Sequence, residues 1–460
     1  MFDWLFDFAE RKKTININGC RVISPFEYFS KIDIREINIG PEVLAIKESA
    51  FESCTSLETI NIHDNIHLIE VKAFYNTKYY DNPENWQDGA LYIGNNLIKV
   101  DNTYEGVFTV RPGTKLIAAE AFGNECASCK LITEVILPDT LKYICPSAFE
   151  NCIGLKKIII PDSVISIGAS AFKNCESLES VQLNAQLKVI PESCFACCTN
   201  LTTVNLPDSI KKIDRLAFSQ CYHLKDIVFP SELEVIGAYA FQHCSELTSI
   251  TIPESIKLID TAAFSVCWRL SEINLPNKVF EIKNVVFNST EYSRNKNNWQ
   301  QGALYIGPHL INVVDEGLYF TVKPGTITIA AEAFFEEFKK LPFTKITLPD
   351  TLQYIGDRAF GNCVNLYEIN LPSSMTSMGR NVFQRCRSLE TICFPGSLTT
   401  IPFGVCSSCV KLQNVYIEKG IRHIDSDAFK DCKSLLEITI PFNLTFEETS
   451  FDDYTKITRC

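Results

Sequence analysis

The chain of 460 residues lacks an excess of positive charge. Its 55 acidic residues outnumber its 43 basic ones and leave a formal net charge of −12. A nucleic-acid binder needs a basic face to displace counterions from phosphates, so this composition argues against a nucleic-acid partner. The sequence also lacks any run near 18 consecutive apolar residues. No membrane span is therefore predicted.

The first residues, MFDWLFDFAERKK, do not have the pattern of a secretory signal. Asp3 and Asp7 stand where such a signal carries basic residues, and the apolar run is too broken to serve as its hydrophobic segment. The default expectation is therefore a cytoplasmic protein.

Catalytic motifs are missing as well. The 6 His are scattered and none forms an H-E-x-x-H pair, and no G-x-S-x-G, phosphate-binding or dinucleotide-binding glycine motif occurs. The acidic residues lie mostly at the variable positions of a sequence repeat that is described below. The simplest interpretation is that they form a solvated surface and have no catalytic role. We expect neither an enzyme nor a cofactor.

The sequence is dominated by a period of 23 residues. The segments AFKNCESLESVQLNAQLKVIPES, AFSQCYHLKDIVFPSELEVIGAY and AFQHCSELTSITIPESIKLIDTA align on one unit. A phenylalanine marks each unit, at Phe149, Phe172, Phe195, Phe218, Phe241, Phe264 and Phe287. A period between 20 and 50 residues is typical of a solenoid, in which each repeat packs only on its neighbours.

Each position of the unit has a structural role. The segment LKKIIIP, at residues 155–161, predicts a short strand that the proline ends because proline has no N–H for a ladder. Stacked strands would form a parallel sheet. A second apolar cluster, with Ile167 and Phe172 pointing inward and Gly168 allowing a bend, predicts the opposite wall. We expect a strand-rich repeat solenoid with a stacked parallel sheet on one wall and short helical or 3-10 turns on the other.

With its AFxxC, LxxIxLP and IG elements, the unit resembles the leucine-rich repeats of the BspA-like family, found in many bacterial and some protozoan surface proteins. The resemblance implies a solenoid that binds other macromolecules, often as an adhesin, and it brings no catalytic residues. It also implies a surface or secreted protein, as the alternative to the cytoplasm.

We expect an N-terminal cap at 1–36, a continuous solenoid at 37–451 with inserts near 76–110 and 289–322, and a tail at 452–460.

Eleven of the 20 cysteines follow the period, each three residues after the repeat phenylalanine or its replacement Cys406. A metal site does not require one cysteine in every repeat. A small side chain with a weak S–H donor, in contrast, suits a turn beneath main-chain carbonyls. Three C-x-x-C pairs occur, from Cys126, Cys194 and Cys406, but they lie far apart on a solenoid. We predict free thiols and no metal.

The outward residues of the predicted sheet are the candidate binding surface. They are Ser180, Thr203, Asp226, Ser249 and Glu272 in one row, and Gln182, Asn205, Thr251 and Asn274 in the next, where Ile159 and Val228 also fall. The rows are poor in Tyr, Trp and Arg, the residues that favour strong protein contacts. Two hypotheses remain: an interaction module for a protein or glycan partner, and an inert spacer or scaffold with no ligand on this face.

Two further stretches, NWQDGALYIGNNLIKV and NWQQGALYIGPHLINV, are nearly the same and lie 213 residues apart. Each begins a similar larger block, which indicates an internal duplication. The LYIG segments predict two short strands around a glycine-containing turn. Trp86 and Trp299 either pack this insert onto the coil or, beside tyrosines such as Tyr79 and Tyr80, stack on a sugar.

Overall fold

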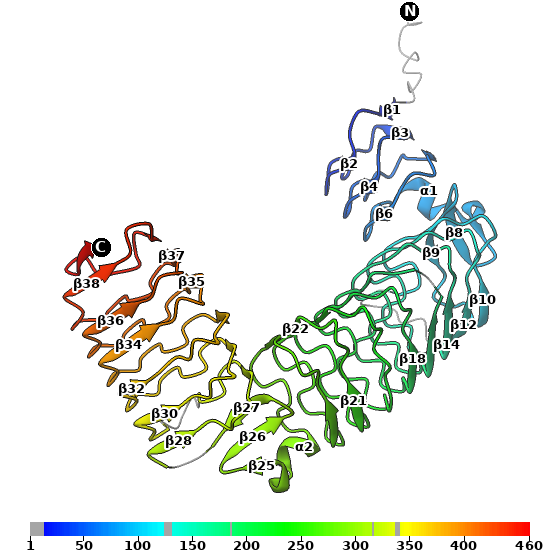
Figure 1. Cartoon of the computed structure of the whole chain (residues 1–460). Helices are drawn as coiled ribbons and strands as arrows, with labels where there is room; N and C mark the ends of the chain where they lie inside the picture. The colour runs from blue at the N-terminus through cyan, green and yellow to red at the C-terminus, as the bar shows by residue number, and fades with distance from the viewer. Residues whose placement is uncertain (1–12, 124–130, 185, 315–316, 336–340) are drawn as a thin grey trace, which may run out of the picture. The chain divides into compact units, whose positions relative to one another are not determined.

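The computed structural model describes residues 13–123, 131–184, 186–314, 317–335 and 341–460. Over these residues the chain winds as a parallel-strand solenoid with little helix, which confirms the predicted fold class (Figure 1). It divides into two compact units. The first unit comprises Met1–Glu232 and Ala240–Leu247, and the second comprises Leu233–Tyr239 and Thr248–Cys460.

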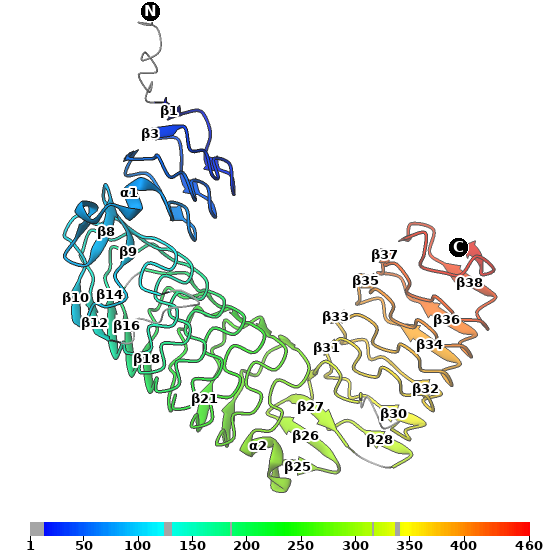
Figure 2. The same cartoon turned by 180° about the vertical axis from the view of Figure 1, so that it is seen from behind.

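The longer strands of the first unit form its first wall, which carries the predicted sheet face. They are β1 (Lys13–Ile17), β3 (Ile34–Ile39), β5 (Thr59–Ile62), β10 (Gly106–Thr109), β12 (Ile132–Ile136), β14 (Lys157–Ile160), β16 (Ser180–Leu183) and β18 (Thr203–Asn205). All neighbouring pairs are parallel, and Figure 2 shows β10 to β18 side by side. In β16 the side chains of Val181 and Leu183 are buried while Gln182 is exposed, so the alternation of a strand with one buried face is present.

The second wall of the first unit consists of two-residue strands. They are β2 (Val22–Ile23), β4 (Ala45–Ile46), β6 (Leu68–Ile69), β11 (Leu116–Ile117), β13 (Tyr143–Ile144), β15 (Ser166–Ile167), β17 (Val189–Ile190) and β19 (Lys212–Ile213). Each is followed by turns instead of the helical or 3-10 segments that we expected on this wall.

The main chain of these turns explains the absence of helix there. Ser170 and Asn174 have φ of 57° and 59°, which interrupts a right-handed helix. Their N–H groups, and that of Phe172, donate to Glu192, Ala196 and Cys194 of the next coil at 2.8–2.9 Å. In a helix these N–H groups would donate to carbonyls of the same segment. Here they donate to carbonyls of the next coil instead.

The second unit repeats this plan. Its first wall comprises β21 (Ser249–Thr251), β23 (Glu272–Asn274), β28 (Tyr319–Thr321), β30 (Lys345–Thr347), β32 (Glu368–Ile369), β34 (Thr391–Phe394), β36 (Asn414–Ile417), β38 (Glu437–Ile440) and β40 (Lys456–Arg459). Its second wall comprises β20 (Val235–Ile236), β22 (Leu258–Ile259), β24 (Glu281–Ile282), β29 (Thr328–Ile329), β31 (Tyr354–Ile355), β33 (Ser377–Met378), β35 (Thr400–Ile401), β37 (His423–Ile424) and β39 (Thr445–Phe446). Parallel pairing includes β1 with β3 and β40 with β38, so ladder strands occur in the segments assigned to the cap and the tail.

Each unit carries one insert, built in the same way. The first holds α1 (Lys78–Asp81), η1 (Pro83–Asn85), β7 (Trp86–Gln87), β8 (Ala90–Ile93) and β9 (Asn96–Val100); the second holds α2 (Glu291–Arg294), η2 (Lys296–Asn298), β25 (Trp299–Gln300), β26 (Ala303–Ile306) and β27 (His309–Val313). The strands are antiparallel, and Gly94 and Gly307 turn the hairpins with φ of 58° and 56°. No described helix has the length and hydropathy needed to cross a membrane.

The repeat phenylalanines form the aromatic core. Phe172 stacks on Phe149 and Phe195 with ring centroids 4.9 and 5.4 Å apart. In the second unit Phe264 stacks on Phe287 at 5.9 Å. These rings are at most 1% exposed, which supports a structural role for them.

Gly168 has a different role from the bend that we expected. Its φ is not in the left-handed region, but a Cβ at this position would overlap the main-chain N of Pro146 and lie 2.6 Å from its Cα. The glycine is needed because neighbouring coils approach closely here.

Candidate functional site

The sheet face of the first unit brings together four of the predicted residues. Ser180 pairs with Thr203 and Gln182 pairs with Asn205 across β16 and β18. Val181 and Val204, which alternate with them, are 3% and 8% exposed, so the four polar side chains point away from the core. Strict periodicity placed these side chains on one face because the strands stack in register.

These four residues line a groove of about 650 Å³, which we call the sheet-face groove. Its other lining residues are Lys157, Ile158, Val181, Val204, Leu206, Asp208, Val228, Phe229, Pro230, Ser231 and Glu232. Asp226, predicted in the same row, does not line the groove. It is exposed but lies at 224–230, where the structure has no strand.

Apolar residues on this face were not among the predicted binding residues. Val228 is 83% exposed and Ile159 is 40% exposed, although both fall in the same outward row as Gln182 and Asn205. Ile136 is 49% exposed and, with Ile159, lines an adjoining hollow of about 670 Å³. The signal in the sequence is an apolar residue at an outward strand position.

The remaining four predicted residues belong to the second unit. Ser249 pairs with Glu272 and Thr251 with Asn274 across β21 and β23. The Asn274 amide donates to Thr251 Oγ1 at 3.4 Å and to Glu272 Oε1 at 3.3 Å. These polar groups partly satisfy one another, as the Gln182 amide of the sheet-face groove is partly satisfied by donating to Asn184 Oδ1 at 2.9 Å.

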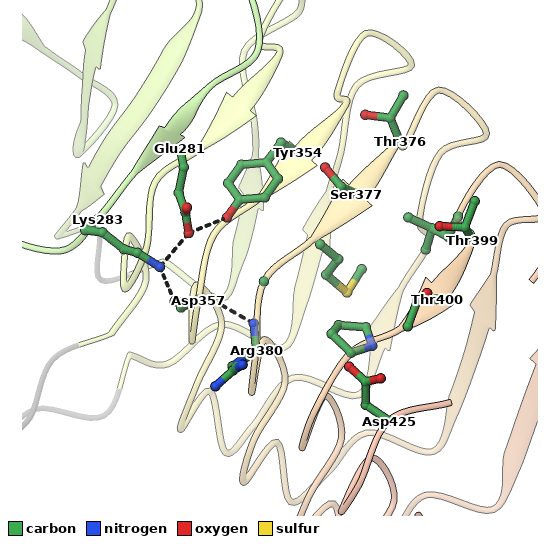
Figure 3. Close-up of a pocket in the computed structure, with 14 residues that line it drawn as sticks. Glu281, Lys283, Tyr354, Asp357, Thr376, Ser377, Arg380, Thr399, Thr400 and Asp425 are labelled. Carbon is green, nitrogen blue, oxygen red and sulfur yellow. Dashed lines mark hydrogen bonds and ion pairs between the residues drawn. The ribbon is translucent and has the colours of Figure 1, made fainter. Parts of the chain in front are cut away.

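A cleft in the second unit contains a charged cluster that sequence reasoning missed. It has a volume of about 540 Å³ and is drawn in Figure 3. Lys283 Nζ lies 2.5 Å from Glu281 Oε1 and 2.6 Å from Asp357 Oδ2, and the Tyr354 hydroxyl donates to Glu281 at 3.2 Å. The main-chain N–H of Arg380 donates to Asp357 Oδ1 at 2.7 Å. Figure 3 shows these residues at one end, with Thr376, Ser377, Thr399 and Thr400 beyond them.

The electrostatics of this cluster follow from its partial burial. Burial alone lowers the pKa of Lys283, but the hydrogen bonds with Asp357 and Glu281 outweigh it and leave the pKa raised. Burial, followed by the charges of Glu281 and Asp357, raises the pKa of Tyr354 far above its usual value. The tyrosine therefore stays neutral and acts as a hydrogen-bond donor, and the cluster joins β24 to β31.

The periodic cysteines form hydrogen bonds between coils, as predicted. The thiols of Cys175, Cys198 and Cys221 donate to the main-chain oxygens of Phe149, Phe172 and Phe195, each at 3.2 Å. The same contact recurs in the second unit, where Cys409 donates to the oxygen of Phe383 at 3.1 Å. Burial raises the pKa of the Cys198 and Cys221 thiols well above the usual value, so these groups are poor nucleophiles.

Metal ligation has no support among the residues that the structure places. Over these residues no group of three or more His, Cys, Asp or Glu side chains is arranged to hold an ion. Cys194 and Cys198 are buried and Cys197 is half-buried. The pair from Cys126 to Cys129 lies outside the described residues.

The insert tryptophans hold their own inserts together. Trp86 Nε1 donates to the main-chain oxygen of Tyr80 at 2.8 Å, and Trp299 Nε1 donates to that of Ser293 at 2.7 Å. Both indoles are half-buried. The equal contacts favour the packing interpretation over sugar stacking, although the binding role itself stays a prediction.

Comparison with known protein families finds a match to the 23-residue repeat of this chain. A model described as the BspA type leucine rich repeat region matches the chain in 6 copies, over residues 6–102, 115–246, 188–302, 212–337 and 327–458. No curated protein matches the sequence.

Several solved structures are similar to the chain. A leucine-rich repeat protein from Bacteroides ovatus is 22% identical with a TM-score of 0.31, over 99% of this chain and 93% of that one. A leucine rich cell surface protein from Faecalibacterium prausnitzii is 23% identical with a TM-score of 0.32, over 83% and 96%. The pneumococcal vaccine antigen PcpA is 16% identical with a TM-score of 0.26, over 81% and 98%.

Because the family model covers well over half of the sequence, the chain belongs to the BspA-type leucine-rich-repeat family.

Proposed function

We propose that the chain is a non-enzymatic interaction module whose first unit binds a partner protein on its sheet face. The observation that carries the proposal is the sheet-face groove of about 650 Å³, in which exposed Val228 lies among polar side chains. This volume is within the range of protein ligand sites, about 300–1,000 Å³.

The chemistry of the groove favours an extended peptide segment with mixed polar and apolar side chains. Gln182 and Asn205 offer amide donors and acceptors, while Val228 offers apolar surface that gains about 25 cal/mol for each Å² removed from water. The strands beneath are held by a parallel ladder, so binding does not have to order the receptor. The charged lining residues are Lys157, Asp208 and Glu232, with a net charge of −1, and we expect affinity that changes only modestly with salt.

The proposal is tested by placing bulky charge in the groove. The double variant Thr203→Arg/Asn205→Arg changes two outward side chains and leaves buried Val204 intact. Ser249→Arg/Thr251→Arg is the matched control, since these two residues occupy the equivalent positions of β21 in the second unit. Partners are captured by chemical crosslinking in cells, identified by mass spectrometry, purified, and titrated against each variant.

We expect the groove variant to lose at least tenfold in affinity for a purified partner while the control keeps it. Equal loss in both variants, or no loss in either, contradicts a specific site in the groove. If all face substitutions leave every partner unaffected, the chain is better explained as an inert spacer or scaffold.

An adhesin role is the narrower form of this proposal and is suggested by the family. It requires the intact protein at the cell surface, whereas a scaffold role is compatible with the cytoplasm. Cell fractionation, with protease shaving of intact cells, distinguishes the two. Recovery of the full-length chain only from the cytoplasmic fraction contradicts the adhesin role.

A further inference from the structure

We propose that a crevice beside the first insert binds a lysine side chain presented by a partner protein. This insert crevice has a volume of about 530 Å³ and lies in the first unit, between the second-wall turns and the insert. Its lining residues are Glu48, Ile69, Glu70, Val71, Lys72, Ala73, Phe74, Tyr75, Tyr80, Ile98, Lys99, Ala118, Ala119 and Glu120. The proposal is independent of the sheet-face groove, which involves other strands.

The inner lining of the crevice is apolar. Phe74 is 1% exposed, Ala118 is 2% exposed and Ile98 is 8% exposed, so all three belong to the core where they meet the crevice. The alkyl stem of a lysine is four carbons long and packs readily along such surface while its ammonium stays near a polar rim. The lining therefore suits a long aliphatic side chain with a polar end.

Two tyrosines form an aromatic corner at the crevice. The rings of Tyr75 and Tyr80 lie 5.5 Å apart at 70°, and Tyr75 is 48% exposed. An ammonium placed over an aromatic face within about 6 Å is attracted by the ring quadrupole, by about 0.5–2 kcal/mol. Burial raises the pKa of Tyr80 to about 12, so its ring stays neutral at physiological pH.

Carboxylates outnumber ammonium groups around the crevice. Glu48, Glu70 and Glu120 line it together with Lys72 and Lys99. The Lys99 ammonium donates to the main-chain oxygens of Glu120 at 2.6 Å and Gly123 at 3.1 Å, which fixes it against the wall. Glu70 is paired with Lys47 of the neighbouring turn at 2.7 Å. The lining alone carries one net negative charge, which Lys47 offsets at Glu70, so the preference for a cation rests on the aromatic corner.

The second insert provides an internal comparison, because its scaffold contacts are the same. The Tyr79 hydroxyl donates to the main-chain oxygen of Tyr92, and that of Tyr292 donates to Tyr305, both at 2.9 Å. The two tryptophan contacts described above match in the same way. The frame of the insert is therefore duplicated.

The aromatic and acidic side chains of the crevice are not duplicated in the second block. By the 213-residue offset, Tyr75 and Tyr80 correspond to Asn288 and Ser293, and acidic Glu48 and Glu70 correspond to Thr261 and Lys283. The second block therefore has no aromatic corner at this place and has a lysine of its own at one of the acidic positions. By the same offset Lys72 and Lys99 correspond to Val285 and Asn312, so the aromatic corner is the feature that distinguishes the first block.

The test uses n-butylammonium as a probe of the lysine side chain, with n-butanol as the neutral probe of the same length. Saturation-transfer NMR on the full chain measures binding of each probe to the wild type and to Tyr75→Asn/Tyr80→Ser. This variant installs the residues of the second block, where Ser293 supports the same tryptophan contact. Tyr416→Asn, at an exposed tyrosine of the second unit, is the control.

We expect n-butylammonium to give at least a threefold stronger signal than n-butanol with the wild type and with Tyr416→Asn. The crevice variant should lose most of this signal while its circular dichroism at the temperature of the NMR measurement remains that of the folded chain. Equal signals from the two probes overturn recognition of the cation. An unchanged signal in the folded crevice variant overturns the location, and a variant that fails to fold is replaced by Tyr75→Asn alone, for which the same loss is required.

Discussion

Lys283 lies 2.6 Å from Asp357, which follows it by 74 residues in the sequence. The interval between them contains the whole second insert, so this contact joins the coil before the insert to a coil after it. The main-chain N–H of Ala331 donates to the oxygen of Ile282 at 2.9 Å and strengthens the same junction. A repeat ladder interrupted by extra residues is thus closed again by specific contacts.

Lys283→Met should destabilise the second unit. The substitution leaves Asp357 and Glu281 close together and partly buried without their cation, at a cost of about 1–2 kcal/mol, because a charge left without its partner is expensive away from water. Urea unfolding monitored by circular dichroism measures the change in the midpoint.

Lys257→Met is the matched control. Lys257 pairs with Glu234 at 2.7 Å, but its side chain is 67% exposed against 24% for Lys283. Exposed pairs contribute about 0–1 kcal/mol, so this variant should change stability little. A loss as large in the control as in Lys283→Met would contradict a special role for the junction.

His309 should make the stability of the second unit depend on mild acid. The imidazole is fully buried; Nε2 lies 2.9 Å from the oxygen of Pro276, while Nδ1 has no hydrogen-bond partner in the described part of the chain. Burial lowers its pKa below the usual 6.5. The unfolded chain therefore binds a proton more readily, and stability is lost as pH falls below 6.5 toward the lower folded pKa, by at most about 1.4 kcal/mol per pH unit.

His309→Asn removes the titrating group and copies the first block, where Asn96 donates to the oxygen of Ile93 at 3.1 Å. Urea midpoints at pH 7.5 and pH 5.5 are compared for the wild type and the variant. The difference between the two pH values should shrink in the variant. An unchanged difference would assign the acid sensitivity to other groups.

The ladder thiols should resist alkylation in the native state. Cys175, Cys198 and Cys221 are buried and their pKa values are raised by burial, whereas Cys460 is exposed. Because the thiolate is the reactive form, iodoacetamide at pH 8 should modify Cys460 fastest and the ladder thiols only after unfolding. Peptide mapping by mass spectrometry gives the order, and the same experiment in denaturant reports whether the ladder cysteines are reduced. Fast native modification of Cys198 would contradict the ladder assignment.

Gly168→Ala should be strongly destabilising, because the added Cβ meets the main chain of Pro146 and main chain cannot move aside as a side-chain end can. We expect about 1–3 kcal/mol, on the scale of other overpacked cores. Gly19→Ala offers a comparison in which φ is 75° but nothing lies within 4 Å of the new atom, so only backbone strain of about 1 kcal/mol opposes it. Thermal unfolding separates the two costs.

Strict periodicity made the first walls predictable. Where the spacing is 23 residues, an outward position in one coil is outward in the next, and Ser180 and Thr203 are paired for that reason. Asp226 shows the limit, since its coil has the same spacing but forms no strand there; the Lys225 N–H reaches the Thr202 oxygen only at 3.4 Å. The part of these residues in binding stays a prediction.

Sites at the inserts could not be predicted in the same way. The contact between Lys283 and Asp357 depends on where the coil resumes after an irregular interval, which spacing alone does not determine. The corner between Tyr75 and Tyr80 depends on the angle at which α1 leaves the coil. The 23-residue spacing is interrupted at the inserts, so it does not predict which residues meet there. These contacts are determined by three-dimensional packing.

The N–H groups of Ser170, Phe172 and Asn174 donate only to the next coil, and this arrangement has a mechanical consequence. Under tension applied between the chain ends, an outermost coil is opposed by a single interface, while interior coils are held on both sides. The chain would yield by peeling from an end, one coil at a time. Outside the two inserts, each step would release 23 residues, or about 80 Å of extended chain, and the molecule would lengthen there in regular increments under load.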